Sequence, residues 1–187
     1  SQLTAKEFAW LQSLPPSISL TAEVFLCHGT PSSDTALETV EVGGVRAASP
    51  EEIELRLGRQ RAPLVACGHT HIARTVRTRQ GQLVVNPGSV GLPAYDDAHP
   101  FPHVVETGSP DARYAIVEKS RHGWGVLQLS VSYDHQSMAG LARRRGRADW
   151  EHALRTGYMP DAWHAHLGSF VPCISLPYRK RGIAQDV

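Results

Sequence analysis

The sequence predicts an α/β fold, and two kinds of observation support that prediction. Three short apolar segments have the composition of buried strands, and small and polar residues follow each at once: VFLC-HGTP, LVAC-GHTH and LVV-NPGSVG. Two other segments begin with helix-capping patterns. Loops at strand ends converge to form sites in sheets that are connected by helices. We therefore expect the chemistry to follow these strands.

The first half of the chain is expected to alternate helices and strands. A Thr-x-x-Glu capping box begins the first helix, and Pro15 and Pro16 end it. Serine, proline and two acids begin the second helix, a pattern that suits the positive end of a helix dipole. The expected elements are a helix over 4–14, a strand over 23–27, a helix from 49 to about 57 and a strand over 64–67.

The second half is expected to contain two hairpins and two helices. Alternating patterns flank the turns at Gln80-Gly81 and at Arg121-His122-Gly123. The segment 92–111 is rich in proline, glycine, histidine and aspartate, so we interpret it as a long functional loop that overhangs the site. The expected elements are strands over 76–78, 83–85, 112–118 and 124–133, helices over 136–145 and 149–156, and an irregular tail over 157–187.

Composition excludes several classes of protein. The 187 residues suit one core, and a formal charge of +1 gives no field for nucleic acid or an anionic membrane. The sequence lacks an apolar run of the ~18 residues that a membrane helix needs, and a basic, apolar leader, so we expect a cytoplasmic protein. Cys27, Cys67 and Cys173 lie far apart without a C-x-x-C pattern, which indicates reduced thiols rather than a disulfide framework or zinc ribbon.

His69 and His71 are the strongest candidate functional residues. In an extended segment, residues i and i+2 point to the same side, so both imidazoles would approach one metal centre or two adjacent ones. Gly68 before them would let the backbone come close to its neighbours. His28 follows another expected strand and strengthens the metal hypothesis, because metal sites draw ligands from separate strand ends.

The segments CHGTP, CGHTH and NPGSVG, in this order, resemble the later motifs of the calcineurin-like metallophosphoesterases, in particular the small bacterial phosphodiesterase-type branch. The resemblance is strong over residues 21–91 and looser to 133. It implies an α/β fold in which two packed sheets flanked by helices hold two divalent metals, and a bridging hydroxide attacks phosphorus. By this resemblance His28, His69 and His71 are metal ligands, residues 86–91 form a supporting turn, and Ser89 and Tyr95 contact substrate.

The early motifs of that family, D-x-H, G-D and G-N-H-D/E, do not occur before His28, where Glu7 and Glu23 are the only acids. The resemblance therefore implies the C-terminal part of such an enzyme, lacking its N-terminal strands and the histidine that acts as general acid. Two metals need carboxylates that neutral imidazoles cannot replace. We expect residues 1–133 to form this part and 134–187 to form a helical and irregular extension.

Other candidate residues have simpler interpretations. Paired acids in a loop are usually solvated, a basic run near a helix end favours the helix dipole, and a cysteine within a strand is usually a small buried hydrophobe. A substrate contact from the histidines of the long loop remains open. These residues are Asp96 and Asp97, His99 and His103, Arg143–Arg145 and Arg147, Cys67, and the tail cluster of Asp161, His164 and His166.

The sequence thus predicts a metal-dependent hydrolase of a small phosphate mono- or diester, inactive as this segment alone. Two divalent ions would serve the complete enzyme, and manganese, iron, zinc and nickel all remain candidates. We expect a homo-oligomer or association with a separate N-terminal part, because removing central strands would leave the edge at residues 24–26 unpaired. One alternative is a non-catalytic binding module with at most one structural metal, and another is a single-zinc hydrolase, which would also need a carboxylate base.

Overall fold

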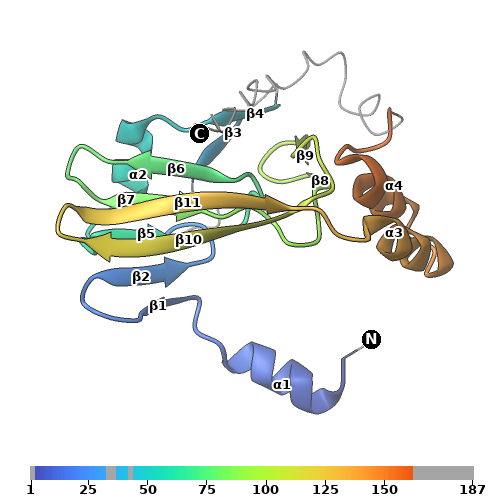
Figure 1. The fold of residues 1–187 in the computed structure, drawn as a ribbon, viewed down its shortest axis with the longest axis horizontal. Coiled ribbons are helices and arrows are strands. Elements are labelled where there is room, and N and C mark those ends of the chain that lie inside the picture. Colours follow the sequence, from blue (N-terminus) through green and yellow to red (C-terminus); the bar gives the residue numbers. More distant parts are fainter. Residues whose placement is uncertain (1–2, 33–36, 42–43, 162–187) are drawn as a thin grey trace, which may run out of the picture.

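A five-stranded mixed sheet forms the centre of the molecule (Figure 1). The computed structural model describes residues 3–32, 37–41 and 44–161. The strands β2, β5 and β7 run parallel, while β1 and β6 pair antiparallel at the two edges. In spatial order they are β1 (Ser17–Ser19), β2 (Val24–Cys27), β5 (Leu64–Ala66), β7 (Leu83–Asn86) and β6 (Arg74–Arg77).

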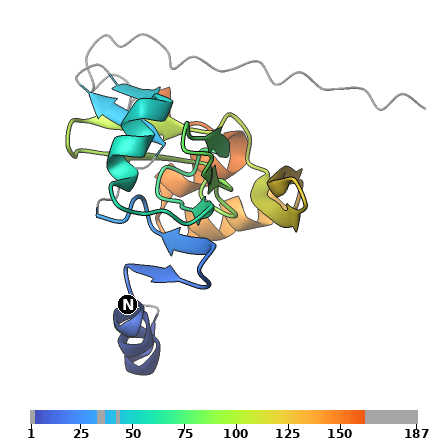
Figure 2. The ribbon, with the colours of Figure 1, turned by 90° about the vertical axis from the view of Figure 1, so that its left-hand side faces the viewer.

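The two faces of this sheet are covered by different structures, as Figure 2 shows. Helix α2 (Pro50–Leu57) packs Ile53 and Leu57 against one face, in a cluster that includes Val65 and Val84. The hairpin of β10 (Ala112–Ser120) and β11 (Gly123–Val131) covers the other face. Its Ala115, Trp124 and Val126 pack against Leu64, Leu83 and Val85. The fold is therefore an α/β sandwich whose second β layer is this hairpin.

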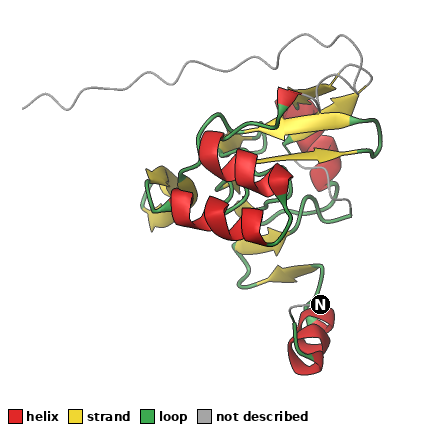
Figure 3. Ribbon diagram, turned by 90° about the vertical axis from the view of Figure 1, so that its right-hand side faces the viewer, coloured by secondary structure: helices red, strands yellow, loops and turns green. Residues whose placement is uncertain are grey.

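The remaining elements flank the sandwich, with α3 and α4 at one end of it (Figure 3), except for α1, which lies apart. Helix α4 packs on β8, and Ala94, Ala153 and Met159 form a small cluster between them. These elements are α1 (Ala5–Ser13), β3 (Glu38–Glu41), β4 (Gly44–Ala47), β8 (Ala94–Asp97), β9 (His103–Glu106), α3 (His135–Arg144) and α4 (Ala148–Thr156).

Local sequence signals predict both capped helices and both predicted hairpins correctly. Thr4 and Ser49 each accept a hydrogen bond from the third helical N–H, and the glutamate at that position reaches back to the cap. The long loop over 92–111 is a wrong prediction, because β8 and β9 pair within it as a hairpin. Its flanking prolines and polar side chains hide a strand pattern that is stabilised by tertiary packing on α4 and β4.

Three further strands lie outside the predicted elements. Strands β1, β3 and β4 are each only three or four residues long and largely polar, so hydrophobic periodicity does not reveal them. Strand β1 corrects a second expectation, because it pairs with β2 and leaves no free edge at residues 24–26. The unpaired edges of the sheet belong to β1 and β6.

Among the described residues, no helix has the length and apolar character that crossing a membrane would require. Helices α3 and α4 belong to the expected extension after residue 133, and their division from the preceding domain stays a prediction. Residues 162–187, which include Cys173, His164 and His166, lie outside the described residues.

Candidate metal centre

The three motifs meet because the parallel strands β2, β5 and β7 end at the same edge of the sheet. Two backbone bonds connect the ends of these strands: the Gly68 N–H donates to the His28 carbonyl at 2.7 Å, and the Cys67 N–H donates to the Val85 carbonyl in β7 at 2.9 Å. This is the place where ligand sites form in parallel sheets. The topology therefore brings together residues that are about 40 and 20 positions apart in the chain.

His28 and His69 form the centre of the site. The His28 Nε2 atom lies 3.0 Å from the His69 Nδ1 atom, and the two rings meet edge to face with centroids 4.9 Å apart. His28 is exposed and His69 is half-buried, so the pair is reached from solvent. The two imidazoles predicted as ligands from separate strand ends are thus in contact.

His71 lies beside this pair in a state that suits metal binding. Its Nδ1 atom is 2.9 Å from the Leu92 carbonyl oxygen, which can only accept, so Nδ1 carries the proton and Nε2 carries the lone pair. Burial lowers the pKa of His71, which further favours the neutral ring. Histidine ligands of metals are oriented in this way, by a bond from the second ring nitrogen to a carbonyl.

Tyr95 holds both histidines of the GHTH segment from β8. Its hydroxyl donates to the His69 carbonyl at 3.3 Å, and its ring packs against His71 with centroids 5.0 Å apart. Burial raises the pKa of Tyr95 to about 12, which keeps the phenol protonated. The prediction that Tyr95 contacts substrate stays a prediction, but its place at the site is now defined.

The GHTH segment is a turn, and the extended conformation assumed for it is wrong. His69 and His71 have φ angles of 65° and 58°. These values lie in the left-handed region, which residues other than glycine rarely adopt. The Thr70 N–H donates to the Gly68 carbonyl at 2.8 Å, which closes the turn. A Cβ at Gly68 would lie 3.7 Å from the His28 carbonyl oxygen, an ordinary contact, so close approach does not explain this glycine.

Asn86 supports the turn from below, as predicted for residues 86–91. Its Nδ2 donates to the Gly68 carbonyl at 2.8 Å and to the Thr70 Oγ1 at 2.9 Å, and its Oδ1 accepts from the Gly88 N–H at 2.9 Å. Ser89 uses its hydroxyl oxygen to accept from the Leu92 N–H at 3.0 Å. Ser89 therefore shapes its own turn, and its contact with substrate stays a prediction.

The histidine pair fits part of a metal coordination sphere. With metal–nitrogen bonds of about 2.1 Å, a nitrogen separation of 3.0 Å corresponds to an angle of about 90° at the metal, close to octahedral and below tetrahedral geometry. Within the described ranges, however, no set of three or more histidine, cysteine, aspartate or glutamate side chains could hold a metal ion. The assignment of these imidazoles as metal ligands therefore stays a prediction.

Glu38, a buried acid on β3 behind the GHTH turn, is not among the residues predicted from the sequence. It is 3% exposed, and its carboxylate accepts a hydrogen bond from the Thr70 side chain. Burial raises its pKa, while this bond and the charges of Arg74 and Arg56 oppose that change. A glutamate within a short polar strand gives little signal in the sequence, because only the tertiary structure buries it.

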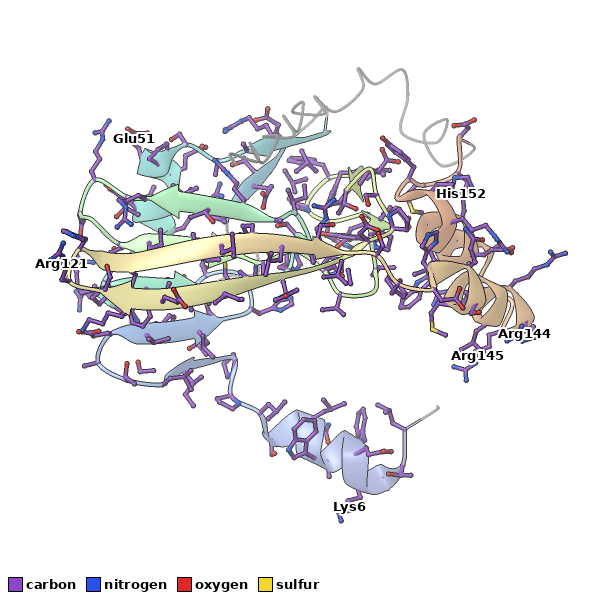
Figure 4. All side chains as sticks on the ribbon, in the orientation of Figure 1. Lys6, Glu51, Arg121, Arg144, Arg145 and His152 are labelled. Carbon is purple, nitrogen blue, oxygen red and sulfur yellow. The ribbon has the colours of Figure 1, made fainter. Side chains whose placement is uncertain are left out.

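The candidate residues that have simpler interpretations bond to partners other than the three histidines, or are exposed. Asp97 accepts from the His99 N–H at 3.0 Å, and the buried His103 bonds to the Phe101 carbonyl at 2.8 Å. Asp96 and Asp161 are exposed. Cys27 and Cys67 are free thiols, and burial raises the pKa of both. The side chains of Arg144 and Arg145 extend from the end of α3 (Figure 4), as expected for a basic helix end.

Comparison with known proteins defines the class of protein that this fold and site represent. The family model of the calcineurin-like phosphoesterase superfamily domain matches residues 4–107, which is more than half of the chain. The chain belongs to this family. A search of curated proteins found no match.

Two solved structures share the fold. A metallophosphoesterase from Sphaerobacter thermophilus superposes with a TM-score of 0.58 and 21% identity, over 83% of this chain and 63% of that one. The hypothetical protein PH1004 from Pyrococcus horikoshii OT3 gives a TM-score of 0.59 and 17% identity, over 83% of this chain and 56% of that one. The chain thus spans less than two thirds of the length of either protein.

Proposed function

We propose that this chain supplies histidine ligands to a metal-dependent phosphoesterase. The single observation that carries the proposal is the 3.0 Å contact between His28 Nε2 and His69 Nδ1 at the ends of adjacent parallel strands. His71, with Nδ1 bonded to Leu92, provides a third neutral imidazole. A bound divalent metal would lower the pKa of its water and neutralise charge on a phosphoryl group.

The proposed substrate is a small phosphate mono- or diester. The complete enzyme is proposed to bind two divalent metal ions. Within this chain, His28, His69 and His71 would bind metal and would not transfer protons. Family membership and the resemblance of the three motifs support this assignment. We further propose that these residues alone are inactive, because the described part of the chain brings no carboxylate to the histidines to bridge two ions.

A second candidate function is a non-catalytic binding module that holds at most one metal. The observation that favours it is the lack of any three-residue ligand cluster among the described side chains. Metal stoichiometry separates the two proposals, since the enzyme needs two ions in its active unit and the module needs one or none.

The test combines metal content with activity. Manganese bound per chain is measured by mass spectrometry after equilibrium dialysis, and hydrolysis of bis(4-nitrophenyl) phosphate is followed with added manganese. We expect the full chain to bind manganese, His69→Ala and His71→Ala to lose it, and His122→Ala, on an exposed hairpin turn, to keep it. We expect no turnover by any of them. Unchanged metal content in all variants would contradict the ligand assignment.

A further inference from the structure

Among the described residues, Glu38 is the one buried acid whose placement the proposed function does not explain. Within the described residues its Oε2 atom is buried and has no hydrogen-bond partner, and the side chain is only 3% exposed. Burying a carboxyl group costs free energy unless its surroundings compensate it. A glutamate therefore occupies this position at a cost, which points to a role for its bonded oxygen.

That role lies in the contact with Thr70, the residue between the two histidines. The Thr70 hydroxyl donates to the Glu38 carboxylate, and the same oxygen accepts from Asn86 Nδ2 at 2.9 Å. Thr70 is 5% exposed and Asn86 is fully buried. The three side chains form a continuous chain of bonds that joins β3, the GHTH turn and the end of β7.

This chain of bonds fixes a strained backbone. His69 and His71 both lie in the left-handed region, a strained conformation that residues other than glycine keep only where the surrounding structure holds them. The Thr70 side chain is the buried anchor between them, and Glu38 sets the direction in which its hydroxyl points. If the turn relaxed, His69 Nδ1 would move away from His28 and His71 Nδ1 from Leu92.

The position of Glu38 is itself set by two arginines. Arg56 donates from Nη1 to the Glu38 carbonyl at 2.9 Å and from Nη2 to Thr39 Oγ1 at 2.6 Å. Arg74 donates from Nη1 to the carbonyl of Leu37, directly before β3, and from Nη2 to the Ala48 carbonyl at 2.8 Å. These bonds tie β3 to helix α2 and to β6, and the two guanidinium charges attract the carboxylate. The acid is therefore held in a rigid frame.

We propose that Glu38 is a positioning residue that acts through Thr70 to hold His69 and His71 in the geometry that meets His28 and Leu92. The proposal rests on the proposed function only in treating these histidines as metal ligands. It predicts that removing either partner of the Glu38–Thr70 bond changes the positions of the His69 and His71 rings, even in the metal-free protein.

The experiment uses the full chain with two pairs of variants. Glu38→Ala and Thr70→Val remove the bond, whereas Glu38→Gln and Thr70→Ser retain an acceptor or a hydroxyl. Glu41→Ala is the matched control, because Glu41 lies on the same strand with its side chain exposed. The readouts are the ring ¹⁵N signals of the histidines by NMR without metal, and the affinity for cobalt from its visible absorption.

Glu38→Ala and Thr70→Val should shift the ring signals of His69 and His71 and weaken cobalt binding by about 10–100-fold, the usual effect of losing an outer partner of a ligand. The two conservative variants and Glu41→Ala should stay within about threefold of the wild type. Should Glu38→Ala fail to fold, Thr70→Val against Thr70→Ser tests the threonine side of the bond, and Thr70→Val also removes the acceptor of Asn86 Nδ2. Unchanged ring signals in folded Thr70→Val would overturn the proposal.

The two proposals fail in different ways. If the wild-type protein binds no cobalt or manganese, the proposed function fails, while the metal-free ring signals still test the role of Glu38. If the wild type binds metal and Thr70→Val binds it equally well with unchanged ring signals, the positioning role fails and the ligand assignment stands.

Discussion

Asn86 shows how a single buried side chain can support a whole site. It is fully buried, and its amide group bonds to the Gly68 carbonyl, the Thr70 hydroxyl and the Gly88 N–H. Each of these partners belongs to a loop that follows a parallel strand. The position of Asn86 at the end of β7 is visible in the sequence, but its three partners become visible only when the strands are placed side by side.

Replacing Asn86 with alanine should therefore destabilise the fold markedly. Each buried polar group left without a partner costs about 1–3 kcal/mol, so we expect a loss of at least ~2 kcal/mol in the free energy of unfolding. Urea unfolding followed by tryptophan fluorescence measures it, with Gln80→Ala on an exposed turn as the control. A loss for Asn86→Ala as small as that of the control would contradict this account of the turn.

The two helices with capping boxes contribute very differently to the fold. Helix α2 buries Ile53 and Leu57 against the sheet, whereas α1 has no buried residue and leaves Phe8 and Trp10 more than half exposed. In Figure 1, α1 lies apart from the sandwich. The capping patterns are equally clear in the sequence, so local signals predict the helices but do not reveal which one packs.

The same substitution in the two helices should separate these roles. Leu57 is 4% exposed and Leu11 is 43% exposed. We expect Leu57→Ala to lower the free energy of unfolding by about 2–5 kcal/mol, because it leaves a cavity in the core. Leu11→Ala should change it by less than about 0.5 kcal/mol. Urea titration of the two variants is the measurement, and equal losses would show that α1 packs on the core.

The β10–β11 hairpin is joined at its open end by Asp111. The hydroxyl groups of Ser132 and Ser130 donate to its carboxylate at 2.9 and 3.3 Å, and these bonds, led by that of Ser132, lower the pKa of Asp111. A carboxyl group with a lowered pKa stabilises the folded state above its unfolded pKa of about 3.9. That contribution is lost as the pH falls through the folded pKa.

Asp111→Asn should therefore lose less stability than the wild type between pH 6 and pH 3. Ser132→Ala should show the same reduced dependence, because it removes the stronger of the two donors. Thermal unfolding at a series of pH values provides the measurement. Identical dependence on pH in all three proteins would mean that Asp111 makes no net contribution.

The whole molecule exposes surfaces that folded proteins usually cover. The outer edge of β1 is unpaired, and the nearby helix α1 presents Phe8, Trp10, Leu11 and Leu14 to solvent. Unpaired edges and apolar patches favour association with another chain. The expected association therefore remains a prediction, but the structure moves its place from β2 to β1 and α1.

We expect the chain to self-associate through this region. Sedimentation equilibrium should give a mass above 20.4 kDa that rises with concentration. The double variant Phe8→Glu/Leu11→Glu should shift the protein toward the monomer, because charged side chains remove the apolar contact. Tyr114→Glu, on the outer face of the hairpin, is the control. A wild-type monomer at all concentrations would rule out this association.

The sequence alone determined the order of the main elements and the three histidines. Capping boxes, apolar strands and hairpin turns each involve only a few neighbouring residues, so each can be recognised from a short segment of the sequence. Short polar strands such as β1 and β3 carry no comparable signal, and the β8–β9 hairpin packs against α4 through contacts that no local pattern shows. The histidines were found because they lie in short polar segments that follow apolar strands.

Only the tertiary structure decided how these residues meet. The 3.0 Å contact between His28 and His69, the left-handed turn at His69 and His71, and the burial of Glu38 all depend on strands that lie far apart in the chain. Burial and hydrogen bonding across such strands are set by the complete packing, which no local pattern encodes. The same acid that would be solvated in an isolated strand therefore becomes a buried partner of Thr70.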